Sequence, residues 1–142
     1  MDKVVVIGGA GFMGSHTADI LSDRGFKVTI FDHQPSSCLR ADQEMVVGDI
    51  LDRDTVNGVV SGAKYLYHFA GIADIGEAKE RPFDTVNLNV MGTTVALEAA
   101  VKSGVERFIY ASTMYVYSPY GSFYRASKQA AEIIIETYQE RF

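Results

Sequence analysis

The chain has 142 residues, which is enough for one domain and too few for two. Hydrophobic residues make up 47% and charged residues 22%, as in an ordinary globular protein, and no stretch approaches the ~20 apolar residues of a membrane span. The formal net charge of −5 and the absence of a basic run argue against nucleic acid as a partner.

The single cysteine, Cys38, excludes an internal disulfide bond, as is usual in a reducing compartment. The first three residues lead directly into a short apolar run. They lack the charged region and the longer apolar stretch of a signal peptide. We therefore expect a cytoplasmic protein with no membrane partner.

Short apolar runs alternate with longer segments along the chain. The first run, residues 4–7, is β-branched and ends at two glycines, which is typical of a buried parallel strand. Gly25 and Gly104 mark the ends of two helices, and Pro82 marks the start of one. In chain order we expect a strand at 4–7, a helix at 13–23, a strand at 27–31, a loop at 33–42, a strand at 44–47, a helix at 52–60, a strand at 65–70, a loop at 73–81, a helix at 82–103, a strand at 107–111 and a helix from about 123 to the end.

Strands that alternate with helices predict βαβ units and a mostly parallel sheet. Right-handed crossovers favour the strand order 3-2-1-4-5, which is that of a doubly wound Rossmann sheet. The sequence contains no internal repeat and no linker. Residues 1–142 are therefore expected to form one Rossmann domain of the α/β class.

A glycine-rich segment follows the first predicted strand. Gly8, Gly11 and Gly14 have the spacing G-x-x-G-x-x-G. A strand that turns tightly into a helix, and a pyrophosphate that approaches backbone N–H groups, both need positions without a Cβ. The helix N-terminus then offers oriented donors to the phosphates. A plain glycine turn has the same spacing, but the strand before it and the helix after it favour a dinucleotide site.

An acidic residue stands at the end of the second predicted strand. Asp32 follows Gly11 by 21 residues, close to the ~20 expected for a carboxylate that binds the ribose hydroxyls of NAD. A carboxylate there would repel the 2′-phosphate of NADP, which usually requires an arginine, whereas His33 comes next in this chain. The sequence therefore predicts NAD as the cofactor, in preference to NADP.

Six blocks together resemble the extended short-chain dehydrogenase/reductase family of NAD-dependent epimerases and dehydratases. The similarity is greatest to its UDP-glucose/galactose 4-epimerase-like members, which act on sugar nucleotides. The blocks occur in the family's order and span nearly the whole chain, at residues 6–16, 48–50, 68–71, 89–93, 111–117 and 124–128.

The resemblance implies which residues contact the cofactor. The glycine turn would hold the pyrophosphate, Asp49 and its neighbour would contact adenine, and the end of the fourth strand would flank the cofactor. The implied NAD contacts are Gly8, Gly11, Phe12, Met13, Gly14, Asp32, His33, Asp49, Ile50, Phe69, Ala70, Gly71, Asn89, Tyr124 and Lys128.

Tyr124 and Lys128 form the pattern Y-x-x-x-K, which places both side chains on one face of a helix. By itself this pattern fits a surface helix pair as well as a catalytic one. A phenol ordinarily titrates near ~10, and a nearby ammonium favours the phenolate that a general base requires. The resemblance implies that Tyr124 exchanges the proton of a substrate hydroxyl while NAD takes the hydride. It further implies that Lys128 holds the nicotinamide ribose and that Thr113 bonds the reacting oxygen.

The sequence also departs from the family. Ala73 stands where some epimerases carry a phosphate-contacting lysine, and Met114 and Tyr115 stand where dehydratases carry acidic residues. Tyr124 follows Thr113 by only 11 positions, a shorter interval than extended epimerases usually have. Extended members continue into further strands and a C-terminal substrate domain, so the resemblance implies that these parts are missing here.

Two functions remain open on the sequence. The first is an NAD-dependent oxidoreductase or epimerase acting on a UDP- or dTDP-sugar. The second is an NAD-binding scaffold, sensor or inactive fragment without turnover. The resemblance also implies a homodimer that pairs through two long helices. No metal is expected, because the histidine and carboxylate residues lack metal-ligand spacing.

Overall fold

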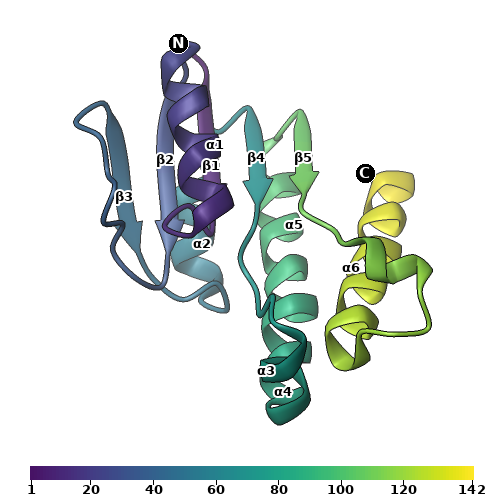
Figure 1. Cartoon of the computed structure of the whole chain (residues 1–142). Coiled ribbons are helices and arrows are strands. Elements are labelled where there is room, and N and C mark those ends of the chain that lie inside the picture. Colours follow the sequence, from purple (N-terminus) through teal and green to yellow (C-terminus); the bar gives the residue numbers. More distant parts are fainter.

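In the computed structural model, which describes residues 1–142, five parallel strands form one sheet in the order β3-β2-β1-β4-β5 (Figure 1). The crossovers place the first strand in the middle of the sheet, between the second and the fourth. The sheet therefore has the predicted Rossmann order. The strands are β1 (Lys3–Ile7), β2 (Lys27–Asp32), β3 (Gln43–Val47), β4 (Tyr65–His68) and β5 (Arg107–Tyr110).

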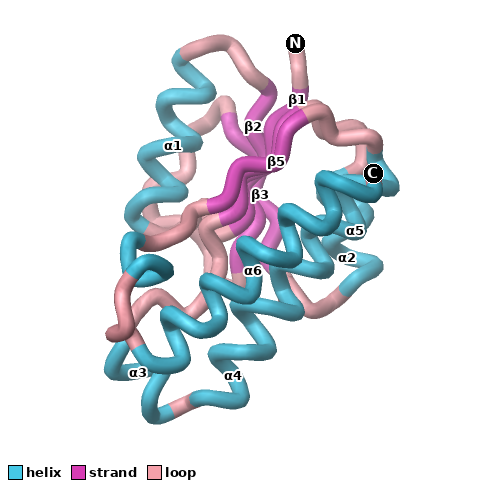
Figure 2. The backbone as a smooth tube through the Cα atoms, turned by 90° about the vertical axis from the view of Figure 1, so that its right-hand side faces the viewer, coloured by secondary structure: helices cyan, strands magenta, loops and turns pink.

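Helices cover the two faces of the sheet unequally. Figure 2 shows α1 alone on one face, and α2, α5 and α6 on the other. The predicted long helix is continuous through α4, a π-helical segment at Asn87–Met91 and α5, because the residues at the junctions keep right-handed helical dihedrals. The helices are α1 (Phe12–Asp23), α2 (Arg53–Val60), α3 (Ile75–Glu80), α4 (Pro82–Val86), α5 (Gly92–Ser103) and α6 (Ser122–Arg141).

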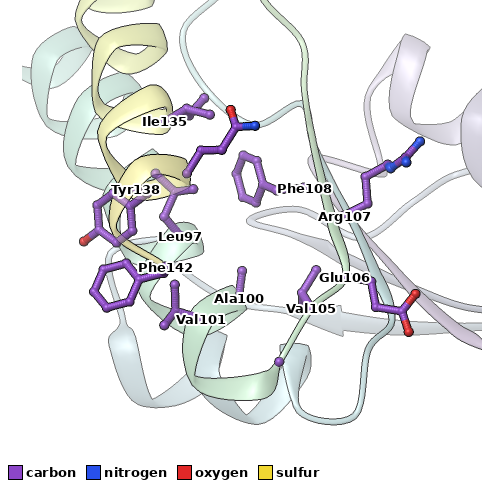
Figure 3. Close-up of a pocket in the computed structure, with 12 residues that line it drawn as sticks. Leu97, Ala100, Val101, Val105, Glu106, Arg107, Phe108, Ile135, Tyr138 and Phe142 are labelled. Atoms are coloured by element: carbon purple, nitrogen blue, oxygen red, sulfur yellow. The ribbon is translucent and has the colours of Figure 1, made fainter.

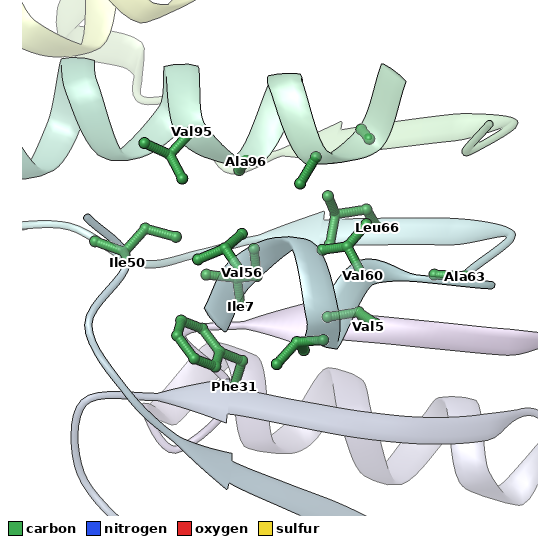
Figure 4. Close-up of a cluster of buried hydrophobic side chains, with 13 residues drawn as sticks. Val5, Ile7, Phe31, Ile50, Val56, Val60, Ala63, Leu66, Val95 and Ala96 are labelled. Carbon is green, nitrogen blue, oxygen red and sulfur yellow. The ribbon is translucent and has the colours of Figure 1, made fainter. Parts of the chain in front are cut away.

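The core is divided by the sheet into two clusters, because successive side chains of a strand point to opposite faces. In β1, Val5 and Ile7 belong to a cluster of 13 buried residues that packs against α2 and α5 (Figure 4). Val4 and Val6 belong to a smaller cluster of six that packs against α1. A strand buried on both faces accounts for the uninterrupted apolar run in the sequence.

The prediction of a loop at 73–81 is wrong, because helix α3 lies within this segment. Asp74 caps this helix, and its Oδ1 accepts a hydrogen bond from the backbone N–H of Glu77. The polar composition of the segment suggested a loop, but a side-chain cap satisfies N–H groups that a short helix leaves open. The fourth strand also ends at His68 rather than at Ala70.

Candidate cofactor-binding and catalytic site

The glycine turn joins β1 to α1 at the carboxyl end of the sheet. Gly8 has φ of +80°, and a Cβ there would lie 2.5 Å from the backbone nitrogen of Ala70. At Gly14 a Cβ would lie 2.2 Å from the carbonyl oxygen of Gly8. At Gly11 it would meet only that same oxygen, at 3.4 Å. Packing thus requires the first and third glycines, whereas the space in front of Gly11 is open to a ligand.

Helix α1 begins at this turn without a capping side chain. Its first N–H groups therefore point to a surface where an anion gains both hydrogen bonds and the positive end of the helix dipole. Phe12 and Met13 are exposed there, at 80% and 62%. The predicted pyrophosphate site has the donors and the clearance that a phosphate group needs.

Asp32 ends β2 beside the turn. Its Oδ2 accepts a hydrogen bond of 3.0 Å from the backbone N–H of Ala10, and its Oδ1 accepts one of 3.3 Å from that of Gln34. The Nδ1 atom of His33 lies 2.9 Å from Oδ1. Only 10% of the Asp32 side chain is exposed. The carboxylate is therefore held in place, where the sequence predicts the ribose of NAD.

A cleft of about 490 Å³ opens next to Asp32. Six of the predicted cofactor contacts line it, from the ends of β2, β3 and β4. Glu77 and Arg81 line it as well, and the sequence did not indicate them because their segment was predicted as a loop. The complete lining is Ile7, Phe31, Asp32, His33, Gly48, Asp49, Ile50, Ala70, Gly71, Ile72, Ala73, Glu77, Arg81 and Leu88.

The predicted catalytic residues lie outside this cleft, after β5 and on α6. Lys128 is 5% exposed, and its Nζ donates a hydrogen bond of 2.8 Å to the carbonyl oxygen of Ala111. Burial lowers the pKa of Lys128 to about 8, so the ammonium still predominates at neutral pH. Tyr124 lies one helical turn earlier, with its ring edge-on to that of Tyr115. The Oγ1 of Thr113 accepts a hydrogen bond of 3.3 Å from the backbone N–H of Tyr115.

Asn89 joins the two halves of the site. Its side chain is buried in the π-helical segment, where Oδ1 accepts a hydrogen bond from the backbone N–H of Ile72 at 2.8 Å. Its Nδ2 donates to the carbonyl oxygen of Ile72 at 3.0 Å and to Oγ of Ser127 at 2.9 Å. The amide therefore links the loop after β4 to α6, and its contact with the cofactor remains a prediction. Phe69 stacks on Tyr67 toward the α1 face, away from the cleft.

His68 is buried at the end of β4. Thr93 donates its one hydroxyl proton to the carbonyl oxygen of Asn89, so Nε2 of His68 donates to Oγ1 of Thr93, at 2.9 Å. Burial, and secondarily the charge of Lys128, lower the pKa of His68 to about 3. The imidazole is therefore neutral at physiological pH.

We expect this buried histidine to make the protein sensitive to acid. Below pH 6.5 the unfolded chain binds a proton at His68 that the folded chain does not, so stability falls with pH down to about 3. This group alone should cost about 2 kcal/mol of unfolding free energy between pH 7 and pH 5. Urea unfolding at both pH values measures the difference. His68→Gln should shrink this difference, whereas equal pH dependence in the parent and in His68→Gln would contradict the assignment.

A second and larger groove, of about 680 Å³, lies between α5, β5 and the end of α6 (Figure 3). Its lining is largely apolar, including Leu97, Phe108 and Ile135, and it contains none of the predicted site residues. The smaller cleft, by contrast, adjoins the glycine turn and includes Asp32 in its lining.

Known proteins resemble this chain both in sequence and in structure. The model of the NAD dependent epimerase/dehydratase family matches residues 4–142. UDP-glucose 4-epimerase of Rhizobium leguminosarum bv. trifolii is 33% identical over 124 residues, which cover 82% of this chain and 37% of that protein. The structure of UDP-glucose 4-epimerase from Brucella ovis in complex with NAD superposes with a TM-score of 0.89 at 30% identity, over 97% of this chain and 48% of that one.

Similarity extends beyond sugar epimerases. The 3 beta-hydroxysteroid dehydrogenase/Delta 5→4-isomerase of Mycobacterium tuberculosis (strain ATCC 25618 / H37Rv) is 36% identical over 121 residues, which cover 80% of this chain and 32% of that protein. The chain thus spans between about a third and a half of the length of these relatives.

Proposed function

This chain belongs to the NAD dependent epimerase/dehydratase family, and from that premise we propose that it is the NAD-binding domain of a nucleotide-sugar epimerase or oxidoreductase. The observation that carries the proposal is the glycine turn, in which Asp32 is bonded to the N–H of Ala10 at the edge of a cleft. NAD, when bound, supplies the acceptor for a hydride from a substrate carbon.

The residues around the turn fit a dinucleotide in the order the cofactor requires. The open face at Gly11 and the uncapped start of α1 suit the pyrophosphate. Asp32 suits the adenosine ribose, because its carboxylate has lone pairs left after the bonds it already accepts. Asp49 and Ile50 line the same cleft and suit adenine. This fit supports NAD over NADP.

We assign the proton chemistry to the predicted trio. Tyr124 exchanges a proton with the substrate hydroxyl, and Thr113 bonds the same oxygen. Lys128 donates to the nicotinamide ribose and supplies the positive charge beside Tyr124. Its burial and its bond to Ala111 restrict its motion, as a positioned group requires.

Titration calorimetry with NAD and NADP tests the cofactor assignment. We expect saturable binding with NAD preferred, and about tenfold weaker NAD binding in Asp32→Asn, which removes the charge from the ribose contact. Asp23→Asn is the matched control, because it changes a surface carboxylate at the far end of α1 and should bind NAD as the parent does. A parent chain that binds NADP as tightly as NAD would refute the assignment of Asp32.

Turnover is tested by adding UDP-glucose to the NAD-loaded protein and following the absorbance of NADH. An absorbance that grows with the sugar nucleotide supports the enzyme. A binding domain without turnover is supported if NAD binds but no such signal appears with UDP- or dTDP-sugars or a hydroxysteroid, both in this chain and in a chimera that restores the C-terminal half of a UDP-glucose 4-epimerase. The hydroxysteroid arm is included because a steroid dehydrogenase is among the relatives.

We further propose a homodimer that pairs through the helix containing α4 and α5 and through α6. Val86, Met91 and Ile133 are apolar residues on these helices that are exposed at 45%, 49% and 59%. Sedimentation equilibrium measures the mass.

No helix in the structure has the length and apolar composition to cross a bilayer. The exposed free thiol of Cys38 suits the reducing conditions of a cytoplasm, which we propose as the location.

A further inference from the structure

The ammonium of Lys128 has an unusual set of neighbours. It forms no ion pair, and its one hydrogen bond within the protein goes to the carbonyl oxygen of Ala111. An ammonium carries three N–H donors, so two of them lack an oxygen acceptor in the protein. Its other close neighbour is the ring of Tyr110, whose centroid lies 4.7 Å from Nζ. That distance is within the range of a cation–π interaction.

The ring of Tyr110 packs against the imidazole of His68. The imidazole of His68 lies 5.8 Å away, centroid to centroid, with 34° between the planes, and Thr93 holds that imidazole by a hydrogen bond. The Tyr110 hydroxyl is itself buried and has no hydrogen-bond partner. The ring is the part of Tyr110 that lies against the ammonium of Lys128.

We propose that Tyr110 is a positioning residue for Lys128, and that its ring face holds the ammonium against the carbonyl of Ala111. The consequence for NAD rests on the function proposed above, because there Lys128 serves the nicotinamide ribose. The contact itself is a property of the folded chain. Aromatic residues stabilise a desolvated cation through the negative charge on the ring face, without a carboxylate that would compete for the ammonium.

Other titratable groups surround this contact from two elements. His68 on β4 faces both Tyr110 and Lys128. Tyr124 and Glu132 on α6 face Tyr110, and Glu132 accepts a hydrogen bond from Ser112. These groups are the same in variants at position 110, so differences between the variants report on the ring.

The experiment compares Tyr110→Leu with Tyr110→Phe by NMR titration of the lysine side-chain nitrogen signals. In Tyr110→Leu the pKa of Lys128 should fall by about one unit, because the cation loses the ring face. In Tyr110→Phe it should stay at the parent's value, since the ring remains. NAD affinity should fall severalfold in Tyr110→Leu and be retained in Tyr110→Phe. Tyr67→Leu is the matched control, because Tyr67 packs toward the opposite face of the sheet.

A Lys128 pKa that is equal in the parent and in Tyr110→Leu would overturn the proposal. An equal shift in Tyr110→Phe and Tyr110→Leu would also overturn it, because the hydroxyl would then be responsible. If Tyr110→Leu does not fold, the chemical shifts of the parent protein still test the proposal. The methylene protons next to Nζ of Lys128 should then be shifted upfield by the ring relative to those of the other lysines, and the absence of that shift refutes the contact. The expected pKa pattern without any NAD binding would leave this contact standing and reject the proposed function.

Discussion

Gly14→Ala should abolish measurable NAD binding. A Cβ at this position would lie 2.2 Å from the carbonyl oxygen of Gly8 and 2.8 Å from the Cα of Gly9, so α1 must move away from the turn. Both atoms belong to the backbone, which cannot rotate aside as a side chain does. We expect a loss of about 3 kcal/mol of unfolding free energy, together with the loss of the oriented N–H groups at the start of α1. Urea unfolding and titration calorimetry measure the two effects.

Substitutions at two further glycines distinguish an effect on stability from an effect on NAD binding. Gly58→Ala, in α2, adds a Cβ that meets nothing within 4 Å, and should leave NAD binding unchanged and stabilise the helix by about 0.5–1 kcal/mol. Gly11→Ala meets only one oxygen, at 3.4 Å, so it should keep the parent's stability and lose NAD affinity through obstruction of the phosphate approach. Parent-like NAD affinity in Gly14→Ala would show that the turn does not build the site.

Tyr124→Phe should reduce turnover at least about a hundredfold and leave NAD affinity near that of the parent. The ring and its packing against Tyr115 remain, whereas the hydroxyl that exchanges a proton with the substrate is lost. The measurement requires a complete substrate site. We would make it in a chimera in which the C-terminal half of a UDP-glucose 4-epimerase follows residue 142, with UDP-galactose as the substrate.

Tyr120→Phe is the control for this variant. Tyr120 lies in the loop before α6 and is 74% exposed, so removal of its hydroxyl should leave turnover at the parent's value. Turnover of Tyr124→Phe close to that of the chimera would reject Tyr124 as the proton-exchanging residue. The retained NAD affinity then shows that the cofactor site has survived the change.

The amino-acid sequence by itself determined the strand order of the sheet and the position of the glycine turn with Asp32 beside it. Uninterrupted β-branched runs such as residues 4–7 indicate buried parallel strands, and the right-handed crossover rule converts their alternation with helices into the observed order. Gly8, Gly14 and Asp32 were recognisable because each meets a local requirement. The first two sit where a Cβ would strike the backbone, and the third ends a strand next to the turn.

Only the tertiary structure decided the features that depend on residues far apart in the chain. Helix α3 was predicted as a loop, because its stability rests on the cap by Asp74 and on packing against α6 rather than on an apolar periodicity. Arg81 directly follows α3, so its position in the lining of the cleft also depended on a helix that the sequence pattern did not predict. The burial of Lys128 and its place on the ring of Tyr110 required β5 and α6 to pack together. Local patterns encode backbone conformation, whereas burial and side-chain partners are set by elements that meet only after folding.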